Sequence, residues 1–363
     1  MIYNKMYYCS LFIVISSVLY LRVLPVSPVY ILLIISIVYT ALKIKVNNDE
    51  LKLFSIMFLV LLIFTGYQAL ELSKVSMLIN TYLSFIVFIF LYISLNKLDV
   101  VTIQNIARKY IIFCVFIVSI ETLYRFLNPI YLSLDNLSGL EVYMYPFKRN
   151  SLMFVDSNYT SILLITNLIL FNLGVLKISK NRFLYLLLFI LLILTFSRAS
   201  ILSYVLITLI YLFLGFFKKN KLLIILFFIF FVSFFLYFKF VIYSGTFSIH
   251  DGSLNSKFRL LNMMIDNVYD NGITFLLFGG GIGNAGDYLD GIGAHNIFVL
   301  IFTEYGLLFA IFMLVFFIIT TVKSKFKILP FWLVMLATGQ ALGFFLAFVF
   351  IPVAFCLSFN KKE

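Results

Sequence analysis

The sequence predicts an all-α protein that crosses a membrane about twelve times. Of its 363 residues, 63% are hydrophobic and 12% are charged, whereas a soluble domain averages about 45–50% apolar and about 25% charged residues. The apolar residues form repeated runs of roughly the length that an α-helix needs to cross a bilayer, about 20 residues. Short groups of basic residues separate these runs, as is typical of membrane topology signals. These observations exclude a soluble domain.

Taken in chain order, the first ten apolar runs each predict one membrane-spanning helix. They lie near residues 6–23, 26–42, 53–70, 75–95, 110–127, 159–176, 181–196, 201–217, 222–243 and 296–320. The first run has no A-x-A-like cleavage site, so we expect it to be retained rather than removed as a signal peptide. A last run, 326–359, is too long for one upright helix. Gly339 and Gly343 divide it into two short spans, which brings the total to twelve.

The positions of the basic residues predict the orientation of these spans. With a cytoplasmic N-terminus, eighteen of the 27 Lys and Arg residues fall in cytoplasmic segments, as the positive-inside rule requires. Twelve spans also place Lys361 and Lys362 inside, so both termini are expected to be cytoplasmic. The chain 1–363 then forms a single transmembrane domain with two long outer loops, 128–158 and 244–294. In the second loop, helical spacing of apolar residues between Ser256 and Val268 predicts an amphipathic helix on the membrane surface.

Several classes of ligand are disfavoured. The net charge of +12 is distributed as topology signals rather than as a basic patch, so no nucleic acid partner is expected. Cys9, Cys114 and Cys356 each lie inside an apolar run and have no metal-ligand spacing. Neither a metal site nor a disulfide is predicted, and no cofactor is expected.

A glycine-rich stretch near the C-terminal end differs from the rest of the chain. It contains seven glycines between residues 279 and 293 and leads to His295 and Asn296 at the outer end of the tenth span. Glycine suits a backbone that turns tightly or approaches a ligand closely, which makes Gly281 and Gly283 candidate binding residues. A histidine at a helix N-terminus is kept neutral by the positive potential there and can act as a base. The segment Gly281–Gly286 also fits GxGxxG, but it lacks the strand and helix of a dinucleotide site.

Basic residues on the outer side run against the topology rule and therefore need another explanation. Arg198 follows a long apolar run at the outer boundary, and Arg259 lies in the predicted amphipathic helix. An ionisable group at membrane depth usually faces a cavity or a partner, and arginine binds phosphate oxygens in a bidentate fork. We expect Arg198 and Arg259 to bind a lipid diphosphate, with Lys148 and Arg149 of the first long loop as further substrate-binding candidates. Snorkelling to lipid headgroups is the alternative.

Three further polar residues lie close to this outer side. Asp156 and Asn158 enter the sixth span, where Asp156 could cap the helix or both residues could bind sugar. Glu304 is nine residues beyond His295, which places it on the opposite face of a regular helix. We therefore expect Glu304 to make a structural hydrogen bond rather than to orient His295.

Taken together, these segments resemble the O-antigen polymerase (Wzy) and O-antigen ligase superfamily. The resemblance covers the second half of the chain and is carried by four segments and Arg259. The segments are Asp156-Ser-Asn-Tyr, Thr195-Phe-Ser-Arg-Ala-Ser, Phe278-Gly-Gly-Gly-Ile-Gly, and His295-Asn-Ile-Phe-Val-Leu with Glu304-Tyr-Gly-Leu. The chain departs from the family in having no Trp after Arg259.

The resemblance implies a metal-independent glycosyltransferase of the bacterial inner membrane whose active face is periplasmic. Its substrate would be an undecaprenyl-diphosphate-linked oligosaccharide, with membrane lipid around it and a chain-length regulator as a possible partner. His295 would be the general base, and Arg198 and Arg259 would stabilise the leaving diphosphate. Two alternatives stay open: a ligase that transfers the glycan to lipid A-core, and a flippase or transporter of lipid-linked oligosaccharide, which would favour internal repeats that the sequence does not show.

Overall fold

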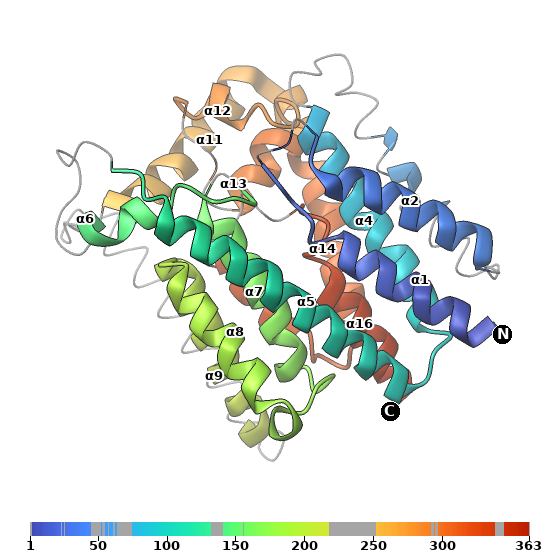
Figure 1. The fold of residues 1–363 in the computed structure, drawn as a ribbon. Coiled ribbons are helices and arrows are strands. Elements are labelled where there is room, and N and C mark those ends of the chain that lie inside the picture. The colour runs from blue at the N-terminus through green and yellow to red at the C-terminus, as the bar shows by residue number, and fades with distance from the viewer. Residues whose placement is uncertain are drawn as a thin grey trace.

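The computed structural model of the protein is a bundle of helices (Figure 1). It describes residues 2–22, 24, 26–44, 52, 55–56, 58–60, 62–63, 75–131, 141–154, 156–217, 252–291, 294, 297–337 and 345–362. Within this part of the chain all regular secondary structure is helical, which confirms the predicted all-α class. The predicted span 222–243, most of the span 53–70, and Gly339 and Gly343 lie outside the described residues.

Two of the helical elements, η3 and η4, are short 3₁₀ turns, and η5 is a π-helical segment. The elements are α1 (Ile2–Ser16), α2 (Pro28–Lys43), α4 (Val75–Leu95), α5 (Val100–Leu127), α6 (Glu141–Met144), η3 (Tyr145–Phe147), α7 (Ser157–Asn172), η4 (Ile178–Lys180), α8 (Arg182–Leu194), α9 (Arg198–Phe217), α11 (Gly252–Phe278), α12 (Ala285–Tyr288), α13 (Ile297–Leu300), η5 (Ile301–Tyr305), α14 (Gly306–Lys323), α15 (Leu329–Ala337) and α16 (Ile351–Asn360). Short connections join α4 to α5, α7 to α8, α8 to α9 and α14 to α15.

The outer surface of the bundle is apolar, as expected of a protein in contact with lipid. On α14, Leu314, Ile318 and Val322 are each about half exposed, whereas Thr320 on the opposite face is buried. Three helical segments of the described chain are long and apolar enough to cross a membrane: Met77–Leu95, Val100–Leu127 and Ile297–Lys323. The apolar helices therefore indicate membrane association, while the number of twelve spans stays a prediction.

Two helices are longer than the sequence predicts. Helix α5 begins at Val100, not near residue 110, because Asp99 caps its N-terminus by accepting a hydrogen bond from the Thr102 N–H at 3.1 Å. Its charged residues Arg108 and Lys109 are exposed on one side and do not interrupt it. The predicted amphipathic helix from Ser256 to Val268 belongs to α11, which continues to Phe278. Gly272, at φ 71° and ψ −161°, is not helical, so α11 consists of two helical parts that meet at a kink.

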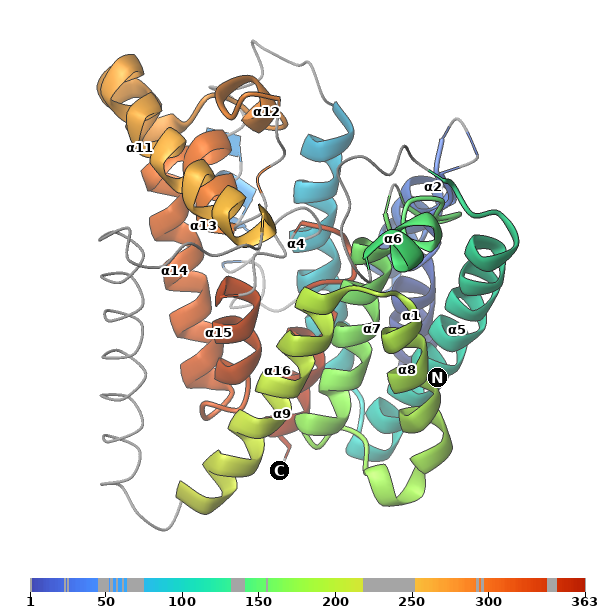
Figure 2. The ribbon, with the colours of Figure 1, turned by 90° about the vertical axis from the view of Figure 1, so that its left-hand side faces the viewer.

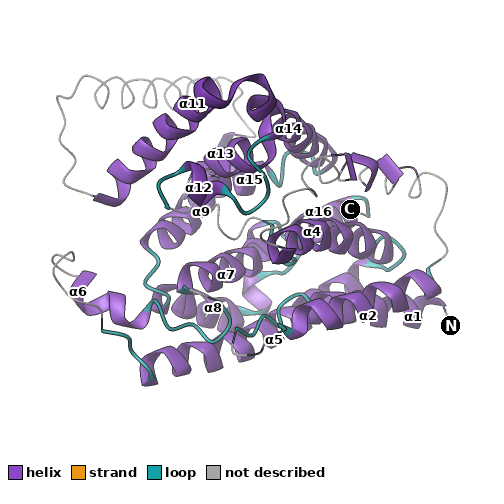
Figure 3. Ribbon diagram, turned by 90° about the horizontal axis from the view of Figure 1, so that it is seen from above, coloured by secondary structure: helices purple, strands orange, loops and turns teal. Residues whose placement is uncertain are grey.

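The core of the bundle lies around α16. All ten residues of α16 are buried, and this helix packs against α4, α5, α7 and α14. Seen along the bundle in Figure 3, α4, α16 and α7 lie between a layer formed by α1, α2, α5 and α8 and a group formed by α11, α13, α14 and α15. In Figure 2, α6 and α12 lie at the upper end of the bundle, and the C-terminus and the α7–α8 connection lie at the lower end.

Candidate functional site

A cavity of about 560 Å³ opens between the two halves of the chain. Its size is within the range of about 300–1,000 Å³ that is usual for small-molecule sites. The residues that line it come from the α1–α2 corner, α2, α4, the start of α7 and the segment before it, the glycine-rich loop, α13, η5 and the segment before α16. They are Tyr20, Leu21, Arg22, Ser27, Tyr30, Met77, Asn80, Thr81, Met153, Phe154, Tyr159, Ala285, Gly286, Gly291, Ala294, Leu300, Glu304, Tyr305, Phe345 and Leu346.

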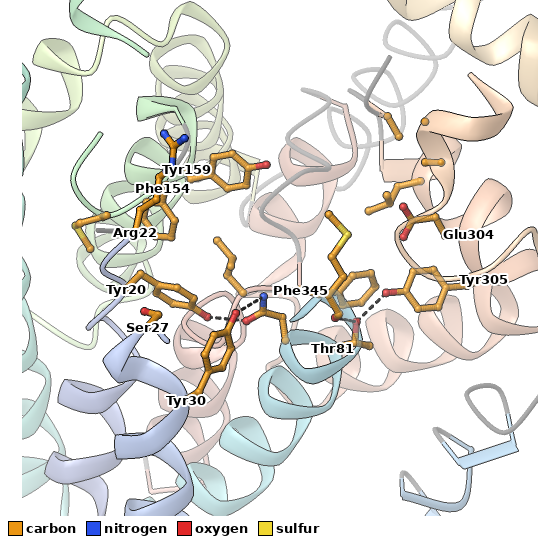
Figure 4. A pocket seen from close by; sticks show the side chains of 18 of the residues that line it. Tyr20, Arg22, Ser27, Tyr30, Thr81, Phe154, Tyr159, Glu304, Tyr305 and Phe345 are labelled. Carbon is orange, nitrogen blue, oxygen red and sulfur yellow. Dashed lines mark hydrogen bonds between the residues drawn. The ribbon is translucent and has the colours of Figure 1, made fainter. Parts of the chain in front are cut away.

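One wall of the cavity is a chain of hydrogen bonds between the first helices (Figure 4). The Ala347 N–H donates to the Tyr20 hydroxyl at 3.1 Å, and the Tyr20 hydroxyl donates to Asn80 Oδ1 at 3.2 Å. Asn80 Nδ2 then donates to the Tyr30 hydroxyl at 3.1 Å. Arg22 lies on the same side, where its backbone N–H donates to the Leu152 carbonyl at 3.0 Å. This wall therefore presents phenol, amide and guanidinium groups to the cavity.

The opposite wall carries a buried carboxyl group. Glu304 is 3% exposed, and Figure 4 shows it across the cavity from Arg22, next to Tyr305. The Tyr305 and Thr81 hydroxyls lie 2.7 Å apart, which joins η5 to α4. Among the described residues of the wall, Arg22 and Glu304 are the charged ones. The cavity is therefore polarised, with a cation on one side and an acid on the other.

The glycine-rich loop packs against the backbone of η5, which carries Glu304. The N–H groups of Gly280 and Gly281 donate to the carbonyls of Thr303 and Glu304 at 2.7 and 3.2 Å. A Cβ at Gly279 would come within 2.5 Å of the Glu304 backbone, and a Cβ at Gly306 would overlap the Leu277 carbonyl. The glycines are thus required for close backbone approach, and they hold the π-helical turn that places Glu304 in the wall.

Gly281 and Gly283 also make the tight turn that their residue type predicts. Their φ angles are 103° and 83°, in the region that residues with a side chain rarely adopt. Asn284 follows them and donates from its side-chain amide to the Gly280 carbonyl at 3.2 Å. The cavity is lined by later residues of the same loop, from Ala285 to Ala294, rather than by Gly281 and Gly283 themselves.

A second contact joins the start of α7 to the turn between α8 and α9. Ser157 Oγ donates to the Thr195 carbonyl at 2.7 Å, and the Ser161 and Ser200 hydroxyls are hydrogen-bonded to each other. Phe196 in this turn has φ 54°, an uncommon value for a residue other than glycine. These contacts bring together the two segments Asp156-Ser-Asn-Tyr and Thr195-Phe-Ser-Arg-Ala-Ser.

A buried ion pair in α5 supports the turn between α8 and α9. Arg125 Nε lies 2.8 Å from Glu121 Oε1, and both side chains are 0% exposed. The Arg125 guanidinium also donates to the Phe147 carbonyl at 2.8 Å and to the Leu194 carbonyl at 3.3 Å. One side chain therefore connects α5, the end of η3 and the end of α8.

The structure places the predicted arginines outside the described cavity wall. Arg198 is the first residue of α9 and is exposed; its turn adjoins α7, and Tyr159 of α7 lines the cavity. Arg259 lies on α11 and forms an ion pair with Asp290 of the glycine-rich loop at 2.6 Å, with both side chains mostly exposed. Such an exposed pair contributes little to stability.

The remaining predicted residues have clear local roles or lie outside the described part. Asp156 caps α7 by accepting a hydrogen bond from the Asn158 N–H at 2.8 Å, as the capping interpretation expects. Lys148 and Arg149 both lie over the Tyr145 ring. His295 and Asn296 lie outside the described residues. Ala294, next to His295 in the sequence, lines the cavity.

Sequence reasoning missed the polar residues of the first helices, namely Tyr20, Tyr30 and Asn80. Asn80 carried one signal that could have identified it, since an amide within an apolar span is costly unless it has partners. Arg22, at the α1–α2 corner, also lines the cavity. Among the described residues, no cluster of three His, Cys, Asp or Glu side chains is placed to hold a metal ion.

Comparisons with protein-family models, with curated proteins and with solved structures give no match for this chain. The resemblance to the O-antigen polymerase and ligase superfamily therefore stays a prediction from the sequence. The function has to be argued from the cavity and from the segments that surround it.

Proposed function

We propose that the protein is a surface polysaccharide polymerase, which transfers a glycan from undecaprenyl diphosphate to another lipid-linked repeat unit. The observation that carries this proposal is the position of the cavity between two pairs of hydrogen-bonded segments. One pair is the start of α7 with the α8–α9 turn, and the other is the glycine-rich loop with η5. Tyr159 belongs to the pair that includes Arg198, and Glu304 belongs to the pair that includes the glycine-rich loop. All four segments on which the resemblance depends thus lie around one cavity or directly behind its wall.

The proposed reaction assigns a task to each chemical group. The acceptor hydroxyl oxygen attacks the anomeric carbon of the donor sugar, and the bond from that carbon to the diphosphate oxygen breaks. The hydroxyl proton passes to His295, which follows the cavity-lining Ala294 in the chain. Arg198 and Arg259 stabilise the negative charge of the departing undecaprenyl diphosphate. No metal or other cofactor takes part in this scheme.

The same proposal includes the location of the reaction. The positive-inside distribution of Lys and Arg supports an outer face for the end of the bundle that carries the cavity. In a bacterial inner membrane this is the periplasmic face, where lipid-linked repeat units and a chain-length regulator would meet the enzyme. Lys148, Arg149 and Arg22 add positive charge at this end for an anionic lipid.

The test is polymerisation by the purified full chain in lipid nanodiscs supplied with lipid-linked repeat units. We expect polymer from the wild type and at least a hundredfold lower rates from His295→Ala and Arg198→Ala, in line with the usual contribution of a general base or a charge-stabilising donor. Arg182→Ala is the matched control. Arg182 is also an exposed first residue of a helix, but it begins α8, whereas the turn that presents Arg198 follows the other end of α8. Normal rates in both site variants would exclude the catalytic scheme.

The ligase alternative predicts a different product in cells. Deleting the gene of a polymerase leaves core carrying a single repeat unit, which appears as one band on a lipopolysaccharide gel. Deleting the gene of a ligase leaves bare core and long chains still attached to undecaprenyl diphosphate. The second pattern would reject the polymerase.

A further inference from the structure

The hydrogen-bond chain in the first wall has a defined direction. Because the Tyr20 hydroxyl accepts from the Ala347 N–H, its own hydrogen is donated to Asn80 Oδ1. This fixes the Asn80 amide so that Nδ2 donates to the Tyr30 hydroxyl. The chain therefore runs from the backbone through Tyr20 and Asn80 and ends at Tyr30.

The end of this chain faces the cavity with unused hydrogen-bonding capacity. A phenol can donate once and accept twice, and an amide NH₂ can donate twice. In the described part of the protein, the Tyr30 hydroxyl accepts one hydrogen bond and Asn80 Nδ2 donates one. The Tyr30 O–H and the second Asn80 N–H are therefore available to a ligand, and donors in such a chain strengthen one another.

Aromatic rings border these donors and provide an apolar surface. The Phe154 ring lies 5.1 Å from the Tyr20 ring and is stacked on the Tyr159 ring at 5.6 Å. A ligand for this wall needs both hydroxyl groups and an apolar C–H face, which is the chemistry of a sugar ring. A lipid tail would leave the Tyr30 and Asn80 donors without partners, which is unfavourable because both side chains are partly buried.

We propose that Tyr20, Asn80 and Tyr30 form a subsite for a sugar ring, with Tyr30 donating to a ring hydroxyl. This inference rests on the proposed function in one respect, because it identifies the sugar as part of the lipid-linked repeat unit. The subsite belongs to the first half of the chain, outside the segments that carry the resemblance. It assigns the N-terminal helices to glycan recognition.

The test compares Tyr30→Phe with Tyr39→Phe. Both residues lie on α2, but Tyr39 is 38% exposed and is absent from the cavity wall. Each substitution removes one oxygen atom and keeps the ring. The full chain in nanodiscs is titrated with two probes: the lipid-linked repeat unit purified from cells that lack this protein, and undecaprenyl diphosphate without sugar.

We expect Tyr30→Phe to weaken binding of the lipid-linked repeat unit about 2- to 12-fold, as the loss of one neutral hydrogen bond predicts. Binding of undecaprenyl diphosphate should not change, and Tyr39→Phe should bind both probes like the wild type. The subsite is refuted if Tyr30→Phe and Tyr39→Phe bind the repeat unit equally, or if Tyr30→Phe weakens both probes alike. If Tyr30→Phe binds the repeat unit more weakly than the wild type does, but the wild type forms no polymer, the subsite stands and the polymerase function fails.

Discussion

Replacing Arg125 by methionine tests how the turn that presents Arg198 is held. The Arg125 guanidinium pairs with Glu121 and also donates to the Phe147 and Leu194 carbonyls. Without it, the Glu121 carboxyl is left in a buried site without its counter-ion, which typically costs about 3–5 kcal/mol of stability. Removing both charges avoids that penalty, and the remaining cost is that of the two carbonyls that lose a donor, about 1–3 kcal/mol in total. The carbonyls lose their donor in both variants, so the double variant Glu121→Leu/Arg125→Met should be more stable than Arg125→Met by the avoided penalty, about 3–5 kcal/mol.

The free energy of unfolding can be followed by the fluorescence of Trp332. It is the single tryptophan of the chain and is 1% exposed, so unfolding changes its environment. The control is Arg149→Met, since Arg149 is an exposed arginine of the neighbouring segment and surface substitutions usually stay within about 0.5 kcal/mol. A loss in Arg125→Met no larger than in this control would refute the anchoring role. A double variant no more stable than Arg125→Met would refute the electrostatic reasoning.

Three further predictions use the same unfolding assay. Gly279→Ala should lose more than about 1 kcal/mol, because Gly279 has φ 73° and no room for a Cβ, while Gly286→Ala, with open space, should not; equal losses would contradict the close-approach argument. Asp156→Ala should cost about 0.5–2 kcal/mol as a lost N-cap, and Asp156→Asn should retain the stability; if Asp156→Asn abolishes polymerisation while it stays folded, its carboxyl group has a role in substrate binding. Asp290→Asn should change stability by less than about 0.5 kcal/mol, because its pair with Arg259 is exposed; a larger loss would show that the pair anchors the loop.

The sequence predicted the helix ends best where hydropathy and basic residues change together. Helix α4 spans Val75–Leu95, the predicted limits, and α2 and α14 end at Lys43 and Lys323. The start of α5 was wrong because charge was taken as the boundary. Hydropathy marks the depth in the membrane, but a helix continues through charged residues whenever they lie on an exposed face.

The site was predictable only in part, because its wall depends on packing between distant segments. The glycine-rich loop has a local signal in its composition, whereas Tyr30 and Asn80 become neighbours only when α2 packs against α4. Glu304 was placed on the face opposite His295 by assuming a regular α-helix. The π-helical segment Ile301–Tyr305, which contains Glu304, departs from that regular geometry. The position of Glu304 relative to His295 stays a prediction, because His295 lies outside the described residues.

The buried serines explain how the turn between the apolar helices α8 and α9 can present Arg198. In apolar surroundings each polar group requires a partner, and Ser157, Ser161 and Ser200 find theirs in the contact between α7 and the α8–α9 turn. Arg198, the residue that begins α9, is exposed. The serines of this segment therefore position the turn, and only Arg198 is placed to meet a charged ligand. Substituting a serine should then lower activity through stability, whereas substituting Arg198 should lower it in a fully folded protein.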